Sequence, residues 1–191
     1  MPNIDMSGVQ ESSGGFEQLE PGGYVCRITR VEPHPEREYA FFEWDVAEGP
    51  HARHFEGSEW PPRDVVSWKG KAVGMTKHKL HVLADANPGK LTPKLAADGS
   101  FAGVEEFDRD EWSRFIGLSF GAVVRRRLYT KKTGETGEGI EIGAWKSPEE
   151  IRAGDFKPMA ARDSRELPQQ VKAATAPAAA GSDVYDEDIP F

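Results

Sequence analysis

Residues 39–46, Tyr39-Ala40-Phe41-Phe42-Glu43-Trp44-Asp45-Val46, have the clearest strand pattern in this chain. Aromatic and β-branched side chains dominate the stretch, and apolar residues recur at every second position. Successive side chains of a strand point to opposite faces. We therefore expect Phe42, Trp44 and Val46 to lie in a protein core, and the odd-numbered residues from Tyr39 to Asp45 to face outward.

The sequence predicts four more extended segments on the same grounds. Pro33-His34-Pro35 is expected to end the first of them, and Pro61-Pro62 interrupts the second. The polar segment 131–137 joins the last two as a flexible hairpin. The four segments are residues 24–31, 52–68, 120–129 and 139–145.

Three helices are predicted from cap signals. Thr76 is expected to cap the first, which stops before Pro88-Gly89. Asp108 with Glu111 three residues later resembles a capping box and is expected to start the second. Ser147-Pro148-Glu149-Glu150 starts a third, short helix with a cap, a proline at the first helical position and an acid at the third.

The resulting order is three strands, a helix and two strands, with an extra helix inserted before the fourth strand. That is the element order of the OB-fold, a partly open five-stranded barrel that binds oligonucleotides. We predict a mainly β protein with minor α, built as an OB-fold-like five-stranded barrel with an inserted helix. The expected divisions are a flexible arm at 1–18, the OB-like domain at 19–158, a disordered linker at 159–182 and an acidic tip at 183–191.

Composition bounds the class of protein. Cys26 is the single cysteine of 191 residues, so neither a disulfide framework nor a cysteine-based metal site is expected. No apolar run approaches the roughly 18 residues that a membrane helix needs. The N-terminus, Met1-Pro2-Asn3-Ile4-Asp5, lacks a signal segment. We expect a cytoplasmic protein with no cofactor and no membrane partner.

The net charge is −8, but it is unevenly distributed. Residues 159–191 account for −3, which leaves −5 for the remainder and argues against indiscriminate binding of polyanions. Two stretches nevertheless contain bases and no acids, and local patches steer ligands more than the total charge does. Their bases are Lys69, Lys71, Lys77 and Lys79 in residues 68–83, and Arg125, Arg126, Arg127, Lys131 and Lys132 in residues 121–134.

The chain ends in Asp186-Glu187-Asp188-Ile189-Pro190-Phe191. Three carboxylates lead into an apolar anchor that carries the terminal carboxylate, a form that suits a hydrophobic pocket rimmed by bases. This tip resembles the acidic C-terminal tail of bacterial and phage single-stranded-DNA-binding proteins. The resemblance implies that replication, recombination or repair proteins bind Asp186, Glu187, Asp188, Ile189, Pro190 and Phe191. The alternative is an acidic end that only aids solubility.

A second resemblance covers roughly residues 15–158. The turn Leu19-Glu20-Pro21-Gly22-Gly23-Tyr24, the turn Glu48-Gly49-Pro50 and the segment 147–156 are similar to those of phage-encoded proteins. Those proteins lie among replication and recombination genes and are regarded as single-stranded-DNA-binding. The resemblance implies a host bacterial cytoplasm as the compartment.

Binding of single-stranded DNA needs cations along the backbone path and aromatic faces on which bases stack. Phe41 and Trp145 can equally be core residues, and Arg126 is expected to point away from its neighbours into a surface ion pair. A solvated charge run is the alternative for residues 121–134. The expected nucleic-acid-binding residues are Phe41, Trp60, Trp68, Lys69, Lys71, Lys77, Arg125, Arg127, Tyr129, Lys131, Lys132 and Trp145.

The sequence offers little support for an enzyme. His51 with His54, and His78 with His81, lack further ligands at recognisable spacing, and no phosphate loop or nucleophile elbow is present. We expect a protein that coats or protects single-stranded DNA during phage replication or recombination and recruits partners through its tip. A homo-oligomer is compatible with this role. The alternatives are an adaptor that docks through the tip without binding DNA, and a recombination-mediator subunit beside an annealing protein.

Overall fold

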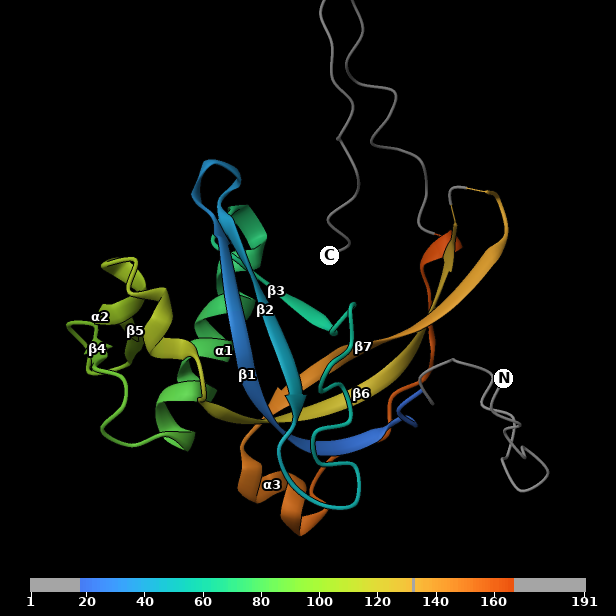
Figure 1. Cartoon of the computed structure of the whole chain (residues 1–191). Helices are drawn as coiled ribbons and strands as arrows, with labels where there is room; N and C mark the ends of the chain where they lie inside the picture. Colours follow the sequence, from blue (N-terminus) through green and yellow to red (C-terminus); the bar gives the residue numbers. More distant parts are fainter. Residues whose placement is uncertain (1–17, 132, 167–191) are drawn as a thin grey trace, which may run out of the picture.

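A computed structural model describes residues 18–131 and 133–166 (Figure 1). Its main sheet contains β1 (Gly22–His34), β2 (Tyr39–Val46), β3 (Arg63–Ser67), β6 (Ser119–Thr130) and β7 (Thr136–Lys146), in the order β3-β2-β1-β6-β7. All four pairings along this path are antiparallel. Helix α1 (Val73–Ala86) follows β3 and precedes β6. The predicted mainly β protein with minor α is confirmed, and the strand order is compatible with the predicted OB-like arrangement.

The long strand β1 lets the sheet curl into a barrel. Its first half, residues 22–27, pairs with β6, and residues 26–34 pair with β2. A bulge between Ile28 and Arg30, just after the part that pairs with β6, bends the strand. The strand ends within Pro33-His34-Pro35, as predicted, although it runs past Val31 to His34 and pairs Pro33 with Ala40. The turn then forms at the 3-10 helix η1 (Pro35–Arg37).

The core follows the alternation of β2. Phe42, Trp44 and Val46 are each no more than 1% exposed, as predicted. Leu80 and Leu83 of α1 belong to the same buried cluster and cover one side of the barrel. Burial of such side chains supplies about 25 cal/mol per Å² of apolar surface and is the main stabilising term of the fold.

The opposite face of β2 is also covered, which corrects the expectation that it points outward. Tyr39, Glu43 and Asp45 are all buried. An Asp45 Oδ1 accepts a hydrogen bond of 3.0 Å from the backbone N–H of Phe55, so the loop after β2 folds back over the strand. Glu43 forms an ion pair of 2.9 Å with Arg63. Period-two patterning alone did not reveal that polar partners would cover this face.

Two of the three predicted helix starts are wrong. α1 begins at Val73, after the 3-10 helix η2 (Gly70–Ala72), and Thr76 lies inside it. The Thr76 hydroxyl instead donates to the Ser67 carbonyl at 2.6 Å. Asp108 does not cap a helix but ends the short α2 (Glu105–Asp108), and the 3-10 helix η3 (Trp112–Phe115) follows.

The third start is confirmed in detail. In α3 (Pro148–Ala153), the Ser147 hydroxyl accepts from the Glu150 N–H at 3.1 Å, and Glu150 accepts from the Ser147 N–H at 2.8 Å. Gly154 ends the helix with a φ of 72°, a left-handed conformation that glycine adopts without strain.

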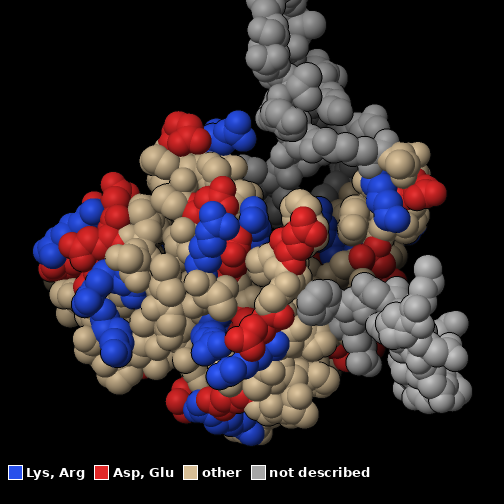
Figure 2. Space-filling view, in the orientation of Figure 1, with Lys and Arg blue, Asp and Glu red and all other residues tan. Residues whose placement is uncertain are grey.

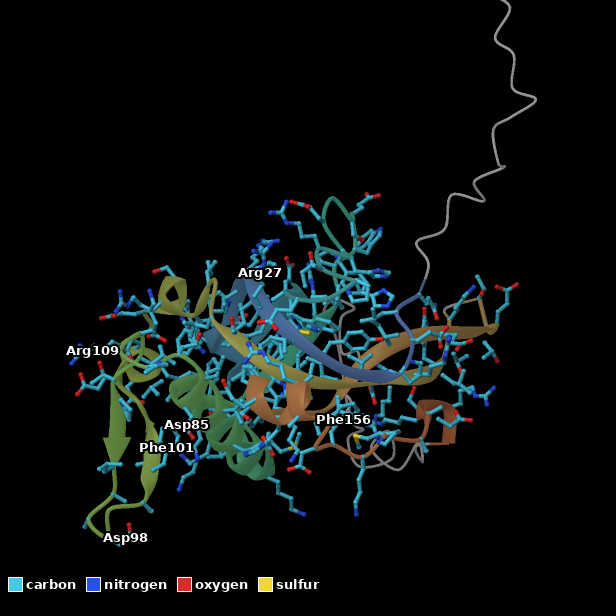
Figure 3. All side chains as sticks on the ribbon, turned by 90° about the horizontal axis from the view of Figure 1, so that it is seen from below. Arg27, Asp85, Asp98, Phe101, Arg109 and Phe156 are labelled. Atoms are coloured by element: carbon cyan, nitrogen blue, oxygen red, sulfur yellow. The ribbon has the colours of Figure 1, made fainter. Side chains whose placement is uncertain are left out.

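A small module is inserted between α1 and β6, where the sequence predicted only an extra helix. It contains the hairpin of β4 (Pro93–Leu95) and β5 (Phe101–Val104), followed by α2 and η3. Figure 3 shows the hairpin projecting away from the barrel, with Asp98 near its tip. Buried Glu106 holds the base of the module by accepting hydrogen bonds from the backbone N–H and the hydroxyl of Thr92.

The folded chain continues past residue 158, where we expected the domain to end. After α3 it runs along the sheet, and β8 (Arg162–Asp163) pairs in parallel with β6 before the 3-10 helix η4 (Ser164–Glu166). Phe156 packs so closely on Gly23 that a Cβ there would lie 2.4 Å from its ring. This close approach explains the glycine. The expected arm up to residue 17, the rest of the linker and the acidic tip lie outside the described residues.

Among the described residues, no helix is both long and apolar enough to cross a bilayer.

Candidate nucleic-acid interface

A groove of about 230 Å³ lies where β3 and α1 face the edge formed by β7, β6 and β8. We call it the cationic groove, because five of its lining side chains are basic and two are acidic. The acids are Asp64 and Glu141, and the bases are Arg63, Lys79, Arg125, Arg127 and Arg162. Elements far apart in sequence supply them, so the fold gathers charges that the chain itself disperses.

Glu141 is the centre of the charge cluster at one side of the groove. Its side chain is 16% exposed, and its Oε1 lies 2.7 Å from both Nε and Nη2 of Arg125. Arg127 Nε and Arg162 Nη1 lie 4.0 and 3.7 Å from its Oε2. Three guanidinium groups thus surround one carboxylate, so an added anion would meet several cationic donors at this corner of the groove.

Gly143 creates the space in which Arg125 lies. It falls at the bulge where β6 and β7 shift register between Val123 and Val124. A Cβ on Gly143 would sit 2.4 Å from the Met159 sulfur and 3.1 Å from the Arg125 Cδ. The missing side chain allows the segment before β8 and the stem of Arg125 to pack together over β7.

The remaining bases are held by acids on the other side of the groove. Arg63 pairs with Glu43, and its guanidinium carbon lies 5.6 Å from the centre of the Phe41 ring. Lys79 is nearly buried, pairs with Asp64 at 2.7 Å and donates to the Val65 carbonyl at 2.6 Å. Lys79 is thus committed to the protein, whereas Arg63 is 39% exposed and can also meet a ligand.

A second hollow of about 380 Å³ adjoins the cationic groove and shares Asp64, Met75, Lys79, Ile142 and Gly143 with it. Its other lining residues are Gly74, His78, Ala144 and Trp145, which makes it largely apolar. Met75, which lines this hollow, is 61% exposed. A charged compartment next to an apolar one matches the two parts of a nucleotide, a phosphate and a base.

The aromatic side chains that we predicted for stacking have divided roles. Trp145 is 4% exposed and stacks on Phe120 with ring centroids 3.9 Å apart, so its faces are used in the core. Its expected role as a surface stacking ring is corrected accordingly. Trp68 stacks on Trp112 at 5.7 Å. Phe41 is half-buried against Tyr39 at 5.0 Å.

Two predicted rings remain accessible. Trp60, in the loop before β3, is 81% exposed. Tyr129, near the end of β6, is 37% exposed and lies across Gly137, where a Cβ would come within 2.5 Å of the ring. Trp60 precedes β3 and Tyr129 lies in β6, two of the strands that line the cationic groove, but neither ring belongs to its lining.

The predicted cations are also only partly brought together. Arg125 and Arg127 line the groove, and Lys69 and Lys71 are exposed on the segment that leads into α1. Lys77 lies near Asp98, on the side of α1 away from Met75 and Lys79. Lys131 pairs with Glu135 at 3.7 Å, and Lys132 lies outside the described residues.

Arg126 forms the surface ion pair that we expected. It points away from Arg125 and Arg127 and contacts Glu138 at 2.7 Å and Glu20 at 3.0 Å. The hydrogen bonds that it donates to both carboxylates raise the pKa of Arg126. These two ion pairs connect the turn before β1 with strand β7.

Sequence reasoning missed Arg63 and Arg162 as site residues and left Lys79 out of the site. Arg162 falls in the segment 159–182, which was predicted to be a disordered linker. One signal was present: Arg125, Arg127 and Glu141 occupy alternating positions on the two strands of the predicted hairpin. Such positions share one face of a sheet.

No group of three or more histidine, cysteine, aspartate or glutamate side chains that could hold a metal occurs in residues 18–131 and 133–166. His51 and His54 instead make an edge contact, with ring centroids 5.9 Å apart.

Over the face shown in Figure 2, basic and acidic side chains are interspersed and do not form one continuous basic surface. The cationic groove is therefore a local feature of an acidic protein. No protein-family model matches the chain, and no curated protein matches it either.

Proposed function

We propose that this protein binds single-stranded DNA in the cationic groove and thereby coats or protects the strand during phage DNA replication or recombination. The observation that carries the proposal is the convergence of Arg125, Arg127 and Arg162 on the single carboxylate of Glu141. The OB-like strand order and the resemblance of the tip support it, because both are typical of proteins that handle single strands.

The acidic body charge is compatible with this function. Arg63 and Lys79 each have an acidic partner close by, which fixes them in place and lowers non-specific attraction. Binding then depends on a few phosphates that reach the groove. Each phosphate contact contributes a salt slope of about −0.7 on single strands, so two or three contacts give roughly −1.4 to −2.

A base next to a bound phosphate would lie in the adjoining apolar hollow, against Met75 and Ile142. Trp60 and Tyr129 would offer stacking faces further along the strand. A stacked base contributes about 1–3 kcal/mol without sequence preference. The proposed binding is therefore weakly dependent on sequence.

The test is a fluorescence anisotropy titration of labelled oligo-dT with the full chain, at roughly 50 and 200 mM salt. We expect binding at low salt that weakens as salt rises. Single-stranded competitor should displace the label better than duplex. Absence of binding at low salt would reject the function.

The rival function is an adaptor that docks on replication or recombination proteins through Asp186 to Phe191 and does not touch DNA. The net charge of −5 outside residues 159–191 favours it. In the same titration an adaptor gives no DNA signal. Whether the protein binds DNA or is only an adaptor, we expect removal of Phe191 to weaken capture of the partner by the tip, because the apolar anchor is lost.

A further inference from the structure

The cationic groove contains an anion of its own. Glu141 belongs to β7, and its carboxylate lies where guanidinium groups from β6 and β8 converge. A DNA phosphate drawn to these arginines would therefore approach a like charge. The following inference rests on the proposed function and concerns its regulation.

The three arginines are not held equally. Arg125 has two nitrogens at 2.7 Å from the same oxygen of Glu141, which is a short, charge-assisted contact. Arg127 and Arg162 lie 4.0 and 3.7 Å from the other oxygen, beyond hydrogen-bond distance. Glu141 thus holds Arg125 firmly and attracts the other two only through longer-range electrostatics.

We propose that Glu141 is a built-in competitor of the DNA backbone. Its carboxylate holds Arg125 in the groove in the free protein, and it repels the phosphate that Arg127 and Arg162 bind. The balance makes the protein bind DNA more weakly than its arginines alone would, so that a coated strand can be released readily.

Glutamine at position 141 separates the two effects of the carboxylate. The amide has nearly the same shape and still offers an oxygen to Arg125, so the arrangement of the groove is retained. Only the negative charge is lost. We take a separation of about 6 Å between the carboxylate of Glu141 and a bound phosphate, and an effective dielectric constant of about 40–80. Removing the charge of Glu141 then corresponds to roughly three- to tenfold tighter binding of DNA.

The experiment compares wild-type protein, Glu141→Gln and the matched control Glu138→Gln in the oligo-dT titration at low salt. Glu138 lies on the same strand and is paired with an arginine, Arg126, but it does not line the groove. Both variants change the net charge equally. We expect Glu141→Gln to bind about three- to tenfold more tightly than wild type, and Glu138→Gln to stay within about twofold.

The outcomes are distinct. Equal or weaker binding by a folded Glu141→Gln protein, with melting and circular dichroism like wild type, would overturn the proposal and make Glu141 a simple support for the arginines. If glutamine unfolds the protein, Glu141→Thr is tested instead, since threonine is neutral and favours strands. If wild type and every variant fail to bind at low salt, the proposed function itself is wrong.

Discussion

Arg127 of β6 and Arg162 of β8 are directly paired in the parallel register of the main sheet. Like charges opposite each other on a sheet destabilise it. Glu141 faces both side chains and offsets the repulsion, and the Arg127 Nε also donates to the Ser164 hydroxyl at 3.4 Å. The fold thus holds two guanidinium groups next to each other in the lining of the cationic groove.

We expect Arg127→Gln and Arg162→Gln each to weaken binding of oligo-dT by about three- to tenfold at low salt. Each change should also reduce the salt slope by roughly 0.7, because one phosphate contact is lost. The titration at several salt concentrations measures both quantities. Arg109→Gln is the control, because Arg109 lies in the inserted module and pairs with Glu105. If the salt slope of DNA binding were unchanged in both variants, Arg127 and Arg162 would not contact DNA phosphates.

Trp145 and Trp60 should behave in opposite ways. Trp145 stacks on Phe120 and donates a hydrogen bond of 2.7 Å from its Nε1 to Asp64. Trp145→Ala is therefore expected to cost about 3–5 kcal/mol of unfolding free energy. Trp60→Ala should leave stability within about 0.5 kcal/mol, because the ring is 81% exposed.

The DNA titration completes that comparison. If Trp60 stacks on a base, its removal costs about 1–3 kcal/mol of binding. Trp145→Phe keeps an aromatic ring on Phe120 and should bind DNA nearly as well as wild type, provided that it is folded. A stable Trp145 variant that loses DNA binding would restore its predicted role as a stacking residue.

Features that depend on neighbours in sequence could be predicted, and those that depend on distant partners could not. The capping box of Ser147 and Glu150 spans four residues, and the alternation of Phe42, Trp44 and Val46 spans five. Trp145 looked equally suited to surface and core because its burial depends on Phe120, on another strand. Arg162 reaches the groove only through the pairing of β8 with β6.

The β4–β5 hairpin was missed for a different reason. Its strands are three and four residues long, too short to display an alternating pattern. The module is held by contacts that are not visible in a local pattern, such as those of the Asn87 side chain to the Ser119 backbone at 2.8 and 2.9 Å.

The cap of α3 predicts a dependence of stability on pH. Hydrogen bonds from the Lys146 side chain and the Ser147 N–H lower the pKa of Glu150 below its ordinary value of 4.5. A carboxyl whose pKa is lower in the folded than in the unfolded protein stabilises the fold above its unfolded pKa. That contribution is lost as pH falls through the folded pKa.

Glu150→Gln should therefore be less stable than wild type by about 0.5–1 kcal/mol at pH 7, where the ion pair and the helix N-terminus favour the carboxylate. The difference should shrink as pH is lowered below about 4.5. Urea unfolding at a series of pH values measures it. The exposed Glu59, changed to glutamine, serves as the control. A difference that is constant with pH would mean that the charge of Glu150 does not stabilise α3.

Gly143 connects the fold to the groove most directly. A methyl group at this position would meet the Met159 sulfur at 2.4 Å, and Met159 and Arg125 would both have to move. Such overpacking typically costs about 1–3 kcal/mol. We expect Gly143→Ala to lose stability in this range.

DNA binding should also weaken in Gly143→Ala, because Arg125 can no longer lie against β7 and hold Glu141 in place. Gly139→Ala is the matched control on the same strand, since its added Cβ would make only an ordinary contact of 3.7 Å with Tyr129. Urea unfolding and the oligo-dT titration report the two effects separately. If Gly143→Ala were destabilised yet bound DNA like wild type, the position of Arg125 would be irrelevant to binding. Phosphate binding in the groove would then depend on Arg127 and Arg162 alone.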